Sequence, residues 1–396
     1  MTQQRSRLLP VLRQFIPVAV LALGMVGLLS PQAARSADFT VEAQASEAWN
    51  FNTNPLMSLD QGKSIYGSVT RGALELKSST PTTTLNFDAA IKQNIFNQSR
   101  FNTTDLHGGL DLSERIERWT AGVQGTTDYD TTRSSELTAY GTDVGNVRHL
   151  GLTVAPQIAF HPTLVDSVFL TSSAMTSRYD SAAYSDYYLI SASPGYTHNF
   201  TPRDTGTFMV QFQRYHAMAA PRLTVDTISP TVGWATTLTP ELTASATVGT
   251  QTSKQKSTTI GQKSWDWQYV FAANLAYQGE VDQMNFRATR EQYPFGNGTQ
   301  SLLTTFTATA THAISQSFAL GLTASYQDAT YQTTPDSIAL RSLVSGGPNL
   351  TYRLTSRFDL SANYLYRRET LFNSDKTVQD HAATLNLLYH PPAWKL

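Results

Sequence analysis

The sequence predicts an all-β protein, a transmembrane antiparallel up-and-down β-barrel of about 18 strands (16–18). Three observations lead to this prediction. Long runs of residues alternate between two kinds of side chain, with the period of a β-strand. Charged residues make up only 15% of the 396 residues, and Thr, Ser, Asn and Gln rather than aliphatic residues take their place. The first 37 residues have the features of an export signal.

The alternation is clearest between residues 308 and 331, where two runs meet at a polar turn near Ser315 and Gln316. Each run has about 12 residues, whereas strands of soluble sheets have ~5–6 and strands that cross an outer membrane need about 9–11. A soluble β-sandwich also alternates, but many long strands in series favour the barrel. One face of the second run is apolar and consists of Phe318, Leu320, Leu322, Ala324 and Tyr326.

Residues 1–37 are predicted to be a cleaved signal peptide. Arg5, Arg7 and Arg13 precede an apolar core over residues 15–29, and small residues follow from Ala33 to Ala37. That core has about 15 residues, fewer than the ~20 of a comfortable membrane span. An uncleaved N-terminal anchor is the alternative. After cleavage of the signal peptide, the mature chain, 38–396, is predicted to be a single barrel domain.

The strands are placed where alternating runs lie between turns that contain Pro, Gly or short polar segments. An even number of strands leaves both ends of the mature chain on the periplasmic side. The count could differ by two, because the loop 131–146 and the proline-containing run 223–238 are open to other interpretations. The predicted strands are 40–50, 64–77, 83–96, 102–113, 118–130, 147–160, 167–180, 186–200, 206–218, 223–238, 242–254, 265–278, 281–293, 299–314, 318–332, 340–354, 358–372 and 378–389.

Composition excludes several functions. The formal net charge of −1 gives no sign of a nucleic-acid partner. Without Cys there is no thiol catalysis, and the eight His show no ligand spacing, so we expect no metal site and no cofactor. No linear catalytic motif is present, which predicts that the protein is not an enzyme. A Ser, His and Asp or Asn set that assembles only in the folded chain is the alternative.

Aromatic residues near strand ends predict the girdles at which a barrel meets the two lipid interfaces. The run 265–278 shows this best, with aromatic side chains at both ends of one face. The expected girdle residues are Trp119, Trp265, Trp267, Tyr277 and Tyr389.

Polar residues on the opposite strand faces are predicted to line the lumen, because a charge facing lipid at the midplane costs roughly 2–4 kcal/mol. A barrel of this size leaves room for water, and neutral groups with charges of both signs suit neutral or weakly anionic solutes such as sugars. The alternative for each residue is that it only makes the lumen wall hydrophilic and forms no part of a selective site. The candidates are Arg71, Glu75, Lys77, Asp88, Lys92, Asp105, His107, Asp111, Gln211, Gln213, Arg287, Glu291, Asn363, Arg367 and Glu369.

Arg133 and Glu136 lie three residues apart in the longest loop, a Thr- and Ser-rich segment. We expect them to pair and to fold the loop into the mouth as a constriction. An ordinary exposed ion pair, worth ~0–1 kcal/mol, is the alternative.

The last predicted strand carries apolar residues at alternate positions up to Tyr389, similar to the C-terminal assembly signal of outer-membrane proteins. That signal usually ends a chain on an aromatic residue, whereas here His390, Pro391 and Pro392 follow. The end of the last strand is therefore undecided by the sequence.

Loop and strand-end motifs in the N-terminal third carry a resemblance. They are Asn52-Thr53-Asn54-Pro55, the segment 66–70 (YGSVT), the segment 118–122 (RWTAG), and the segment 130–137 (DTTRSSEL) with Gly141. With them the chain resembles the outer-membrane β-barrel porins of exopolysaccharide systems, the EpsL-like group of the "beta-barrel porin 2" class.

This resemblance implies an outer-membrane barrel near a polysaccharide pathway. The predicted function is a channel that passes a hydrophilic solute across the bacterial outer membrane, most simply an exopolysaccharide or oligosaccharide. Its partners would be outer-membrane lipid, polysaccharide and periplasmic export proteins, and the barrel is expected to be a monomer. A scaffold barrel without an open pore is the main alternative, and an outer-membrane hydrolase is a third.

Overall fold

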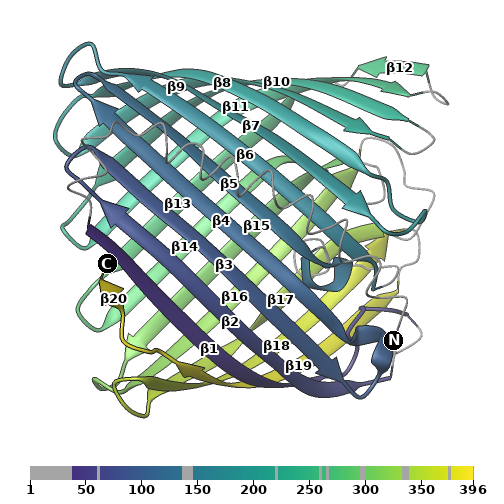
Figure 1. The fold of residues 1–396 in the computed structure, drawn as a ribbon. Coiled ribbons are helices and arrows are strands. Elements are labelled where there is room, and N and C mark those ends of the chain that lie inside the picture. Colours follow the sequence, from purple (N-terminus) through teal and green to yellow (C-terminus); the bar gives the residue numbers. More distant parts are fainter. Residues whose placement is uncertain are drawn as a thin grey trace.

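The structure, a computed structural model, is a cylinder of tilted antiparallel strands (Figure 1). It describes residues 38–59, 63–135, 146–218, 222–257, 261–264, 267–294, 300–331, 339–372 and 376–395. The predicted signal peptide lies outside these residues and stays a prediction. None of the helices in the described ranges is long and apolar enough to cross a membrane.

The all-β prediction is confirmed, with a closed barrel of 18 long strands in the described part of the chain. Two further strands, β12 (Gly261–Ser264) and β20 (Trp394–Lys395), are short, and one turn of 3-10 helix, η2 (Ser99–Phe101), follows β3. The long strands are β1 (Asp38–Asn52), β2 (Ile65–Ser79), β3 (Thr83–Phe96), β4 (Thr103–Ile116), β5 (Trp119–Thr131), β6 (Arg148–Phe160), β7 (Asp166–Tyr179), β8 (Tyr187–Asn199), β9 (Asp204–Ala217), β10 (Leu223–Thr237), β11 (Leu242–Ser257), β13 (Gln268–Gln278), β14 (Asp282–Pro294), β15 (Gln300–Ala313), β16 (Phe318–Tyr331), β17 (Ala339–Arg353), β18 (Phe358–Phe372) and β19 (Thr377–Tyr389).

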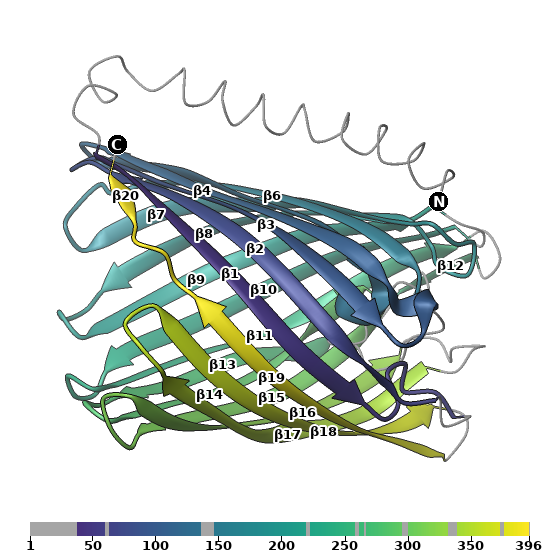
Figure 2. The ribbon, with the colours of Figure 1, turned by 60° about the horizontal axis from the view of Figure 1, so that its bottom comes forward.

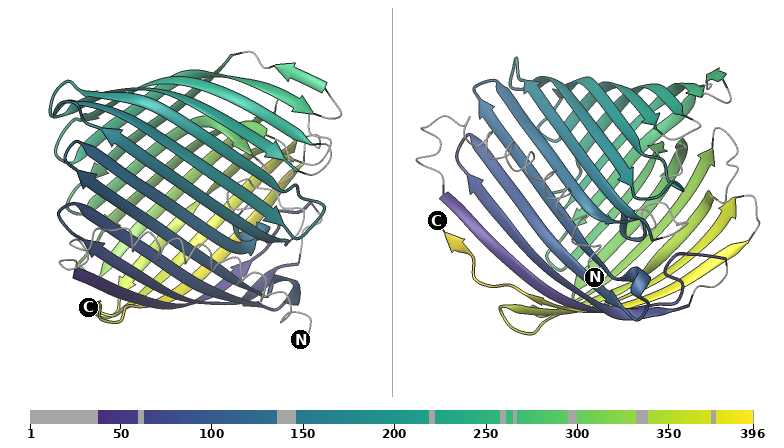
Figure 3. Two further views of the ribbon diagram at one scale, coloured as in Figure 1. Left: turned by 45° about the horizontal axis from the view of Figure 1, so that its top comes forward. Right: turned by 45° about the vertical axis from the view of Figure 1, so that its right-hand side comes forward.

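Each long strand pairs with its neighbours in chain order, and β1 closes the cylinder by pairing with β19 (Figure 3). The closing register runs from Ala45 opposite Tyr389 to Asn52 opposite Ala382. Closure leaves no free sheet edge, which is the condition for a sheet to lie in lipid.

Hydroxyl side chains fix the short turns at one end of the barrel. In the turn between β2 and β3, Thr80 Oγ1 accepts the N–H of Thr83 at 2.9 Å, so the side chain replaces a backbone acceptor. The same bond recurs two hairpins later, from Asp166 N to Thr163 at 3.0 Å. Four more turns repeat it with Thr201, Thr239, Ser315 and Thr355.

The C-terminal tail continues the last strand. After Tyr389 the chain passes through Pro391 and Pro392, which cannot donate to a ladder, and β20 then pairs with β1. Figure 2 shows this yellow tail beside the purple first strand. Trp394 lies opposite Val41, whereas the pairing of β1 with β19 begins further along β1, at Ala45. The tail therefore extends the seam between the first and last strands beyond Tyr389, where the sequence left the end of the last strand undecided.

Several predicted strand boundaries were wrong by three residues, since β4 ends at Ile116 rather than at 113 and β11 ends at Ser257 rather than at 254. A strand was expected over 265–278, but β13 begins at Gln268 and the short β12 precedes it. Trp265 lies outside the described residues. The proline-containing run is a regular strand, because β10 keeps one register with β11 on both sides of Pro230.

Candidate functional site

Large exposed apolar side chains alternate along the strands and mark the outer face of the barrel. Ile91 and Ile95 of β3 and Phe208 and Phe212 of β9 are examples. By strand alternation and register, every predicted lumen residue lies on the opposite, inner face. Their roles in solute passage stay predictions.

The inner face of β1–β5 is a charged wall. Lys77 Nζ lies 3.1 Å from a Glu42 carboxylate oxygen and 2.9 Å from one of Glu75. On this wall carboxylates outnumber Lys and Arg. The carboxylates are Glu42, Glu75, Asp88, Asp105, Asp111, Asp128 and Asp130, and the cations are Arg71, Lys77, Lys92 and Arg115.

His107 links three strands of the charged wall. Its Nε2 is 3.1 Å from Asp88 Oδ2 on β3, and its Nδ1 is 2.6 Å from Asp128 Oδ1 on β5. Two residues before His107 on β4, Asp105 is bound by Arg148 of β6, whose Nη1 donates to Asp105 Oδ1 at 2.9 Å. The predicted residues of β3 and β4 are therefore members of cross-strand networks rather than isolated charges.

The inner face of β7–β11 is neutral by contrast. Ser, Thr, Gln and Met side chains of these strands line a hollow of about 420 Å³. Gln211 and Gln213, predicted from the sequence, lie here, and so does Gln251 of β11, which the sequence analysis missed. On its other side the hollow is lined by β14 residues that include Arg290 and Glu291.

The end of β14 leaves the wall and bends inward. Its pairing with β13 stops at Arg290, opposite Phe271. Beyond that point Gln292 is buried, and its Oε1 accepts hydrogen bonds from Thr227 of β10 at 2.7 Å and Ser253 of β11 at 3.1 Å. Gln292 Nε2 donates to Gln300 at 2.8 Å. The end of β14 thus lies against the inner face of β10 and β11.

The first loop is held by a buried carboxylate on β19. Asp380 is 0% exposed and accepts from Arg367 of β18, at 2.6 Å from Nη2 and 3.1 Å from Nε. It also accepts from Asn52 Nδ2 at 3.1 Å, Thr53 Oγ1 at 3.1 Å and the backbone N–H of Asn54 at 2.9 Å. We call these five residues the first-loop lock. The motif from Asn52 to Pro55 therefore has a structural role.

Two apolar side chains of the first loop pack on two parts of the inner wall. Met57 belongs to a buried cluster of residues on β15–β19, including Leu303 and Leu371. Leu56 packs on a second cluster, formed by Ile65, Phe96 and Phe101. The loop thus covers part of the mouth, a role that the sequence assigned to a later loop.

The predicted constriction by Arg133 and Glu136 stays untested, because Glu136 lies outside the described residues. The Arg133 guanidinium lies over the rings of Phe96 and Phe101, 4.9 and 5.4 Å from their centroids. Arg133 is therefore held close to the second cluster, at the end of β3.

The predicted aromatic girdle residues lie at strand ends where the structure describes them. Trp119 contacts Phe160 with ring centroids 4.7 Å apart, and Tyr389 contacts Phe358 at 4.9 Å. Tyr277 is exposed near the end of β13, and Trp267 is exposed just before that strand. The sequence analysis missed Phe200, Trp234 and Trp394, of which the first two stack at 5.1 Å.

A Ser, His and Asp set does assemble at one rim, but without the geometry of a catalytic triad. Ser135 Oγ and Asp130 Oδ1 both contact Nδ1 of His149, at 3.4 and 3.3 Å. A triad needs the Ser and the Asp on different ring nitrogens. In the described ranges no group of three or more His, Asp or Glu could hold a metal.

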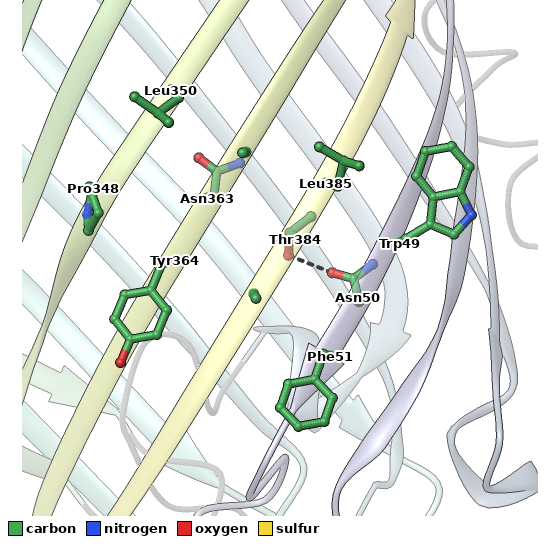
Figure 4. A pocket seen from close by; sticks show the side chains of 11 residues that line it. Trp49, Asn50, Phe51, Pro348, Leu350, Asn363, Tyr364, Thr384 and Leu385 are labelled. Carbon is green, nitrogen blue, oxygen red and sulfur yellow. Dashed lines mark hydrogen bonds between the residues drawn. The ribbon is translucent and has the colours of Figure 1, made fainter.

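A second hollow, of about 460 Å³, lies on the outer face near the seam. Figure 4 shows Trp49, Phe51, Leu350 and Tyr364 around it, with the hydrogen bond from Thr384 Oγ1 to Asn50 Oδ1 (2.7 Å) on the strands below. Most of its lining consists of apolar, lipid-facing side chains, so it is not a site for a hydrophilic solute.

Comparison with solved structures finds matches over most of the chain at low sequence identity. The channel DcaP of Acinetobacter baumannii is 11% identical, with a TM-score of 0.47 over 90% of this chain and 98% of that one. Pseudomonas aeruginosa OccK11 (OpdR) is 11% identical, with a TM-score of 0.46 over 91% and 97%. OccK2 (OpdF) of the same organism, solved with glucuronate, is 9% identical, with a TM-score of 0.47 over 91% and 99%.

At these values the similarity carries no argument about a solute or a residue. No family model matches the chain, and no curated protein matches its sequence. The resemblance to exopolysaccharide-associated porins therefore gains no support from these comparisons.

Proposed function

We propose that this chain is a bacterial outer-membrane channel through which small hydrophilic solutes diffuse passively. The observation that supports it is the contrast between the two faces of one closed barrel. The outer face carries exposed apolar side chains with aromatics at strand ends, whereas the inner face carries charged and amide side chains. Buried charges without water or partners are costly, so a polar inner face suits a water-filled path.

The solutes that fit best are small, and neutral rather than anionic. A barrel of 16–18 strands leaves an aqueous channel, which the first loop and the inward tip of β14 make narrower here. The carboxylate excess on β1–β5 disfavours the weakly anionic solutes suggested by the sequence. The exopolysaccharide proposal rests on motifs alone, and Asn52 to Asn54 already serve the first-loop lock.

The test is single-channel conductance of the refolded mature chain, 38–396, in a planar bilayer. We expect a steady conductance in KCl that falls when small sugars enter the lumen. A heat-dependent shift on a gel shows that the protein is folded. Folded protein without conductance would contradict the proposed channel function. A block by long polysaccharide at lower concentration than by small sugars would favour the polymer.

One observation favours a scaffold with a closed mouth as the second candidate, namely the contacts of Leu56 and Met57 with two separate wall clusters. Replacing residues 55–58 with Gly and Ser separates the two candidates. A silent wild type and a conducting loop variant would indicate a barrel that is closed by its first loop. Equal conductance of both proteins would rule out that closure.

A further inference from the structure

The neutral hollow has the size and lining of a ligand site. Its volume of about 420 Å³ exceeds the ~30 Å³ share of a single water and falls in the ~300–1,000 Å³ range of ligand pockets. Amide and hydroxyl side chains come from adjacent strands, with Gln211 on β9, Ser229 on β10 and Gln251 on β11. Met175 and Met209 add apolar surface beside them.

Gln251 is a buried donor without an acceptor. The residue is 3% exposed, and its Nε2 has no hydrogen-bond partner among the residues that the structure describes. Folded proteins satisfy nearly all of their buried polar groups, so an exception at a hollow points to a ligand group. Arg290 Nε is likewise buried without an acceptor, although Nη1 of the same side chain donates to Thr304 at 2.6 Å.

Arg290 and Glu291 carry opposite charges at the edge of the hollow, so its lining has no net charge. An ionised carboxylate only accepts hydrogen bonds, and the amide NH₂ of Gln251 only donates them. A cationic ligand group could not accept from Gln251, and a lining in which Arg290 and Glu291 offset each other favours no net charge on the ligand. A hydroxyl both accepts and donates, and the C–H face of a sugar ring suits the methionines.

From this arrangement we propose that the hollow between β9–β11 and the end of β14 binds a neutral polyhydroxylated solute of sugar size. The inference rests on the proposed channel for its role in the cell, because the site lies on the inner face of the barrel. Binding itself does not depend on conduction and is tested separately.

The binding test uses refolded protein in detergent and saturation-transfer NMR with three sugars of similar shape. Glucose is neutral, glucosamine is a cation and galacturonate is an anion. We expect glucose to bind more tightly than either charged sugar. Equal binding of the three sugars, or a preference for a charged one, would overturn the proposal.

The variant Gln251→Met keeps the side-chain volume and removes the donor. It should weaken glucose binding about three- to tenfold, the effect of one neutral hydrogen bond. Gln124→Met is the matched control, because Gln124 is an inner-face amide on β5 that donates to Asp111 instead. Unchanged binding by Gln251→Met, or equal losses in both variants, would contradict the site.

Conductance separates this inference from the proposed function. If the folded barrel binds glucose through Gln251 but is silent in bilayers, the binding site is supported and the proposed channel function is contradicted. If the barrel conducts but does not bind glucose, the channel function is supported and the proposed binding site is contradicted.

Discussion

Asp380 combines two roles at the residue scale, because the same carboxylate neutralises Arg367 and holds the first loop. Hydrogen bonds to an ionised group are stronger than those between neutral groups. The sequence placed Arg367 on the inner face by alternation but did not identify its partner. Strand register, which brings Arg367 opposite Asp380, depends on the whole sheet.

We expect Asp380→Ala to lower the free energy of unfolding by about 3–5 kcal/mol, because it leaves Arg367, 11% exposed, without its carboxylate. Urea unfolding in phospholipid vesicles measures the change. Asp111→Ala is the control, since Asp111 is on the inner face and its partner Gln124 is exposed; it should stay within about 0.5 kcal/mol. Similar losses in both variants would show that the lock does not stabilise the barrel.

Two buried glutamines should respond in opposite directions to the same substitution. Gln292 is bonded through both its Oε1 and its Nε2, so Gln292→Met should lower the free energy of unfolding by about 2 kcal/mol. Gln251→Met removes an unsatisfied donor and should raise it by about 1 kcal/mol in protein without sugar. The same unfolding measurement serves both variants, and a destabilised Gln251→Met would mean that the amide has a structural role.

At the element scale, alternation alone predicted most of the strands. Both ends of β3 and of β18 agree with the sequence-based bounds, and the run with Pro230 is a strand as predicted. The inward bend of β14 was missed, because residues 291–294 continue a strand-like pattern while their pairing with β13 has ended. The pairing of β20 was also missed, since two residues after a double proline give no periodic signal.

Truncation after Tyr389 should lower the fraction of chain that refolds into a heat-modifiable barrel. Without the tail, Thr40 and Val41 of β1 lose their partners along the seam, and unpaired backbone groups are costly in lipid. Gel shift after refolding into vesicles measures the folded fraction. A chain with Pro391→Ala and Pro392→Ala keeps the tail and should refold at least as well as the wild type. Equal refolding of the truncated chain would contradict the role given to the tail.

At the scale of the whole molecule, charge is unevenly distributed over the inner face. Carboxylates exceed cations on β1–β5, whereas β7–β11 are neutral. Alternation predicted the face of each side chain but not this asymmetry, because the asymmetry appears only when the strands are placed around one axis. Rings or walls of carboxylates favour cations in a pore.

We therefore expect the open channel to pass K⁺ more readily than Cl⁻. The reversal potential under a KCl gradient measures this preference. Replacing Asp88 and Asp128 together with Asn should reduce it, because both carboxylates face the lumen beside His107. Asp282→Asn on the outer face, beside His312, is the control and should leave it unchanged. An anion-selective wild type would contradict the asymmetry argument.

The first-loop lock also has a consequence for the time course of assembly. Asn54 and Asp380 lie 326 residues apart in the chain, just after the first strand and in the last long strand. The loop can be held only after these two strands have met, so the mouth acquires its final width as the last event of folding. A barrel in the process of closing should pass through a leaky stage. Large dyes would then escape from vesicles early in refolding and be retained once the seam is complete.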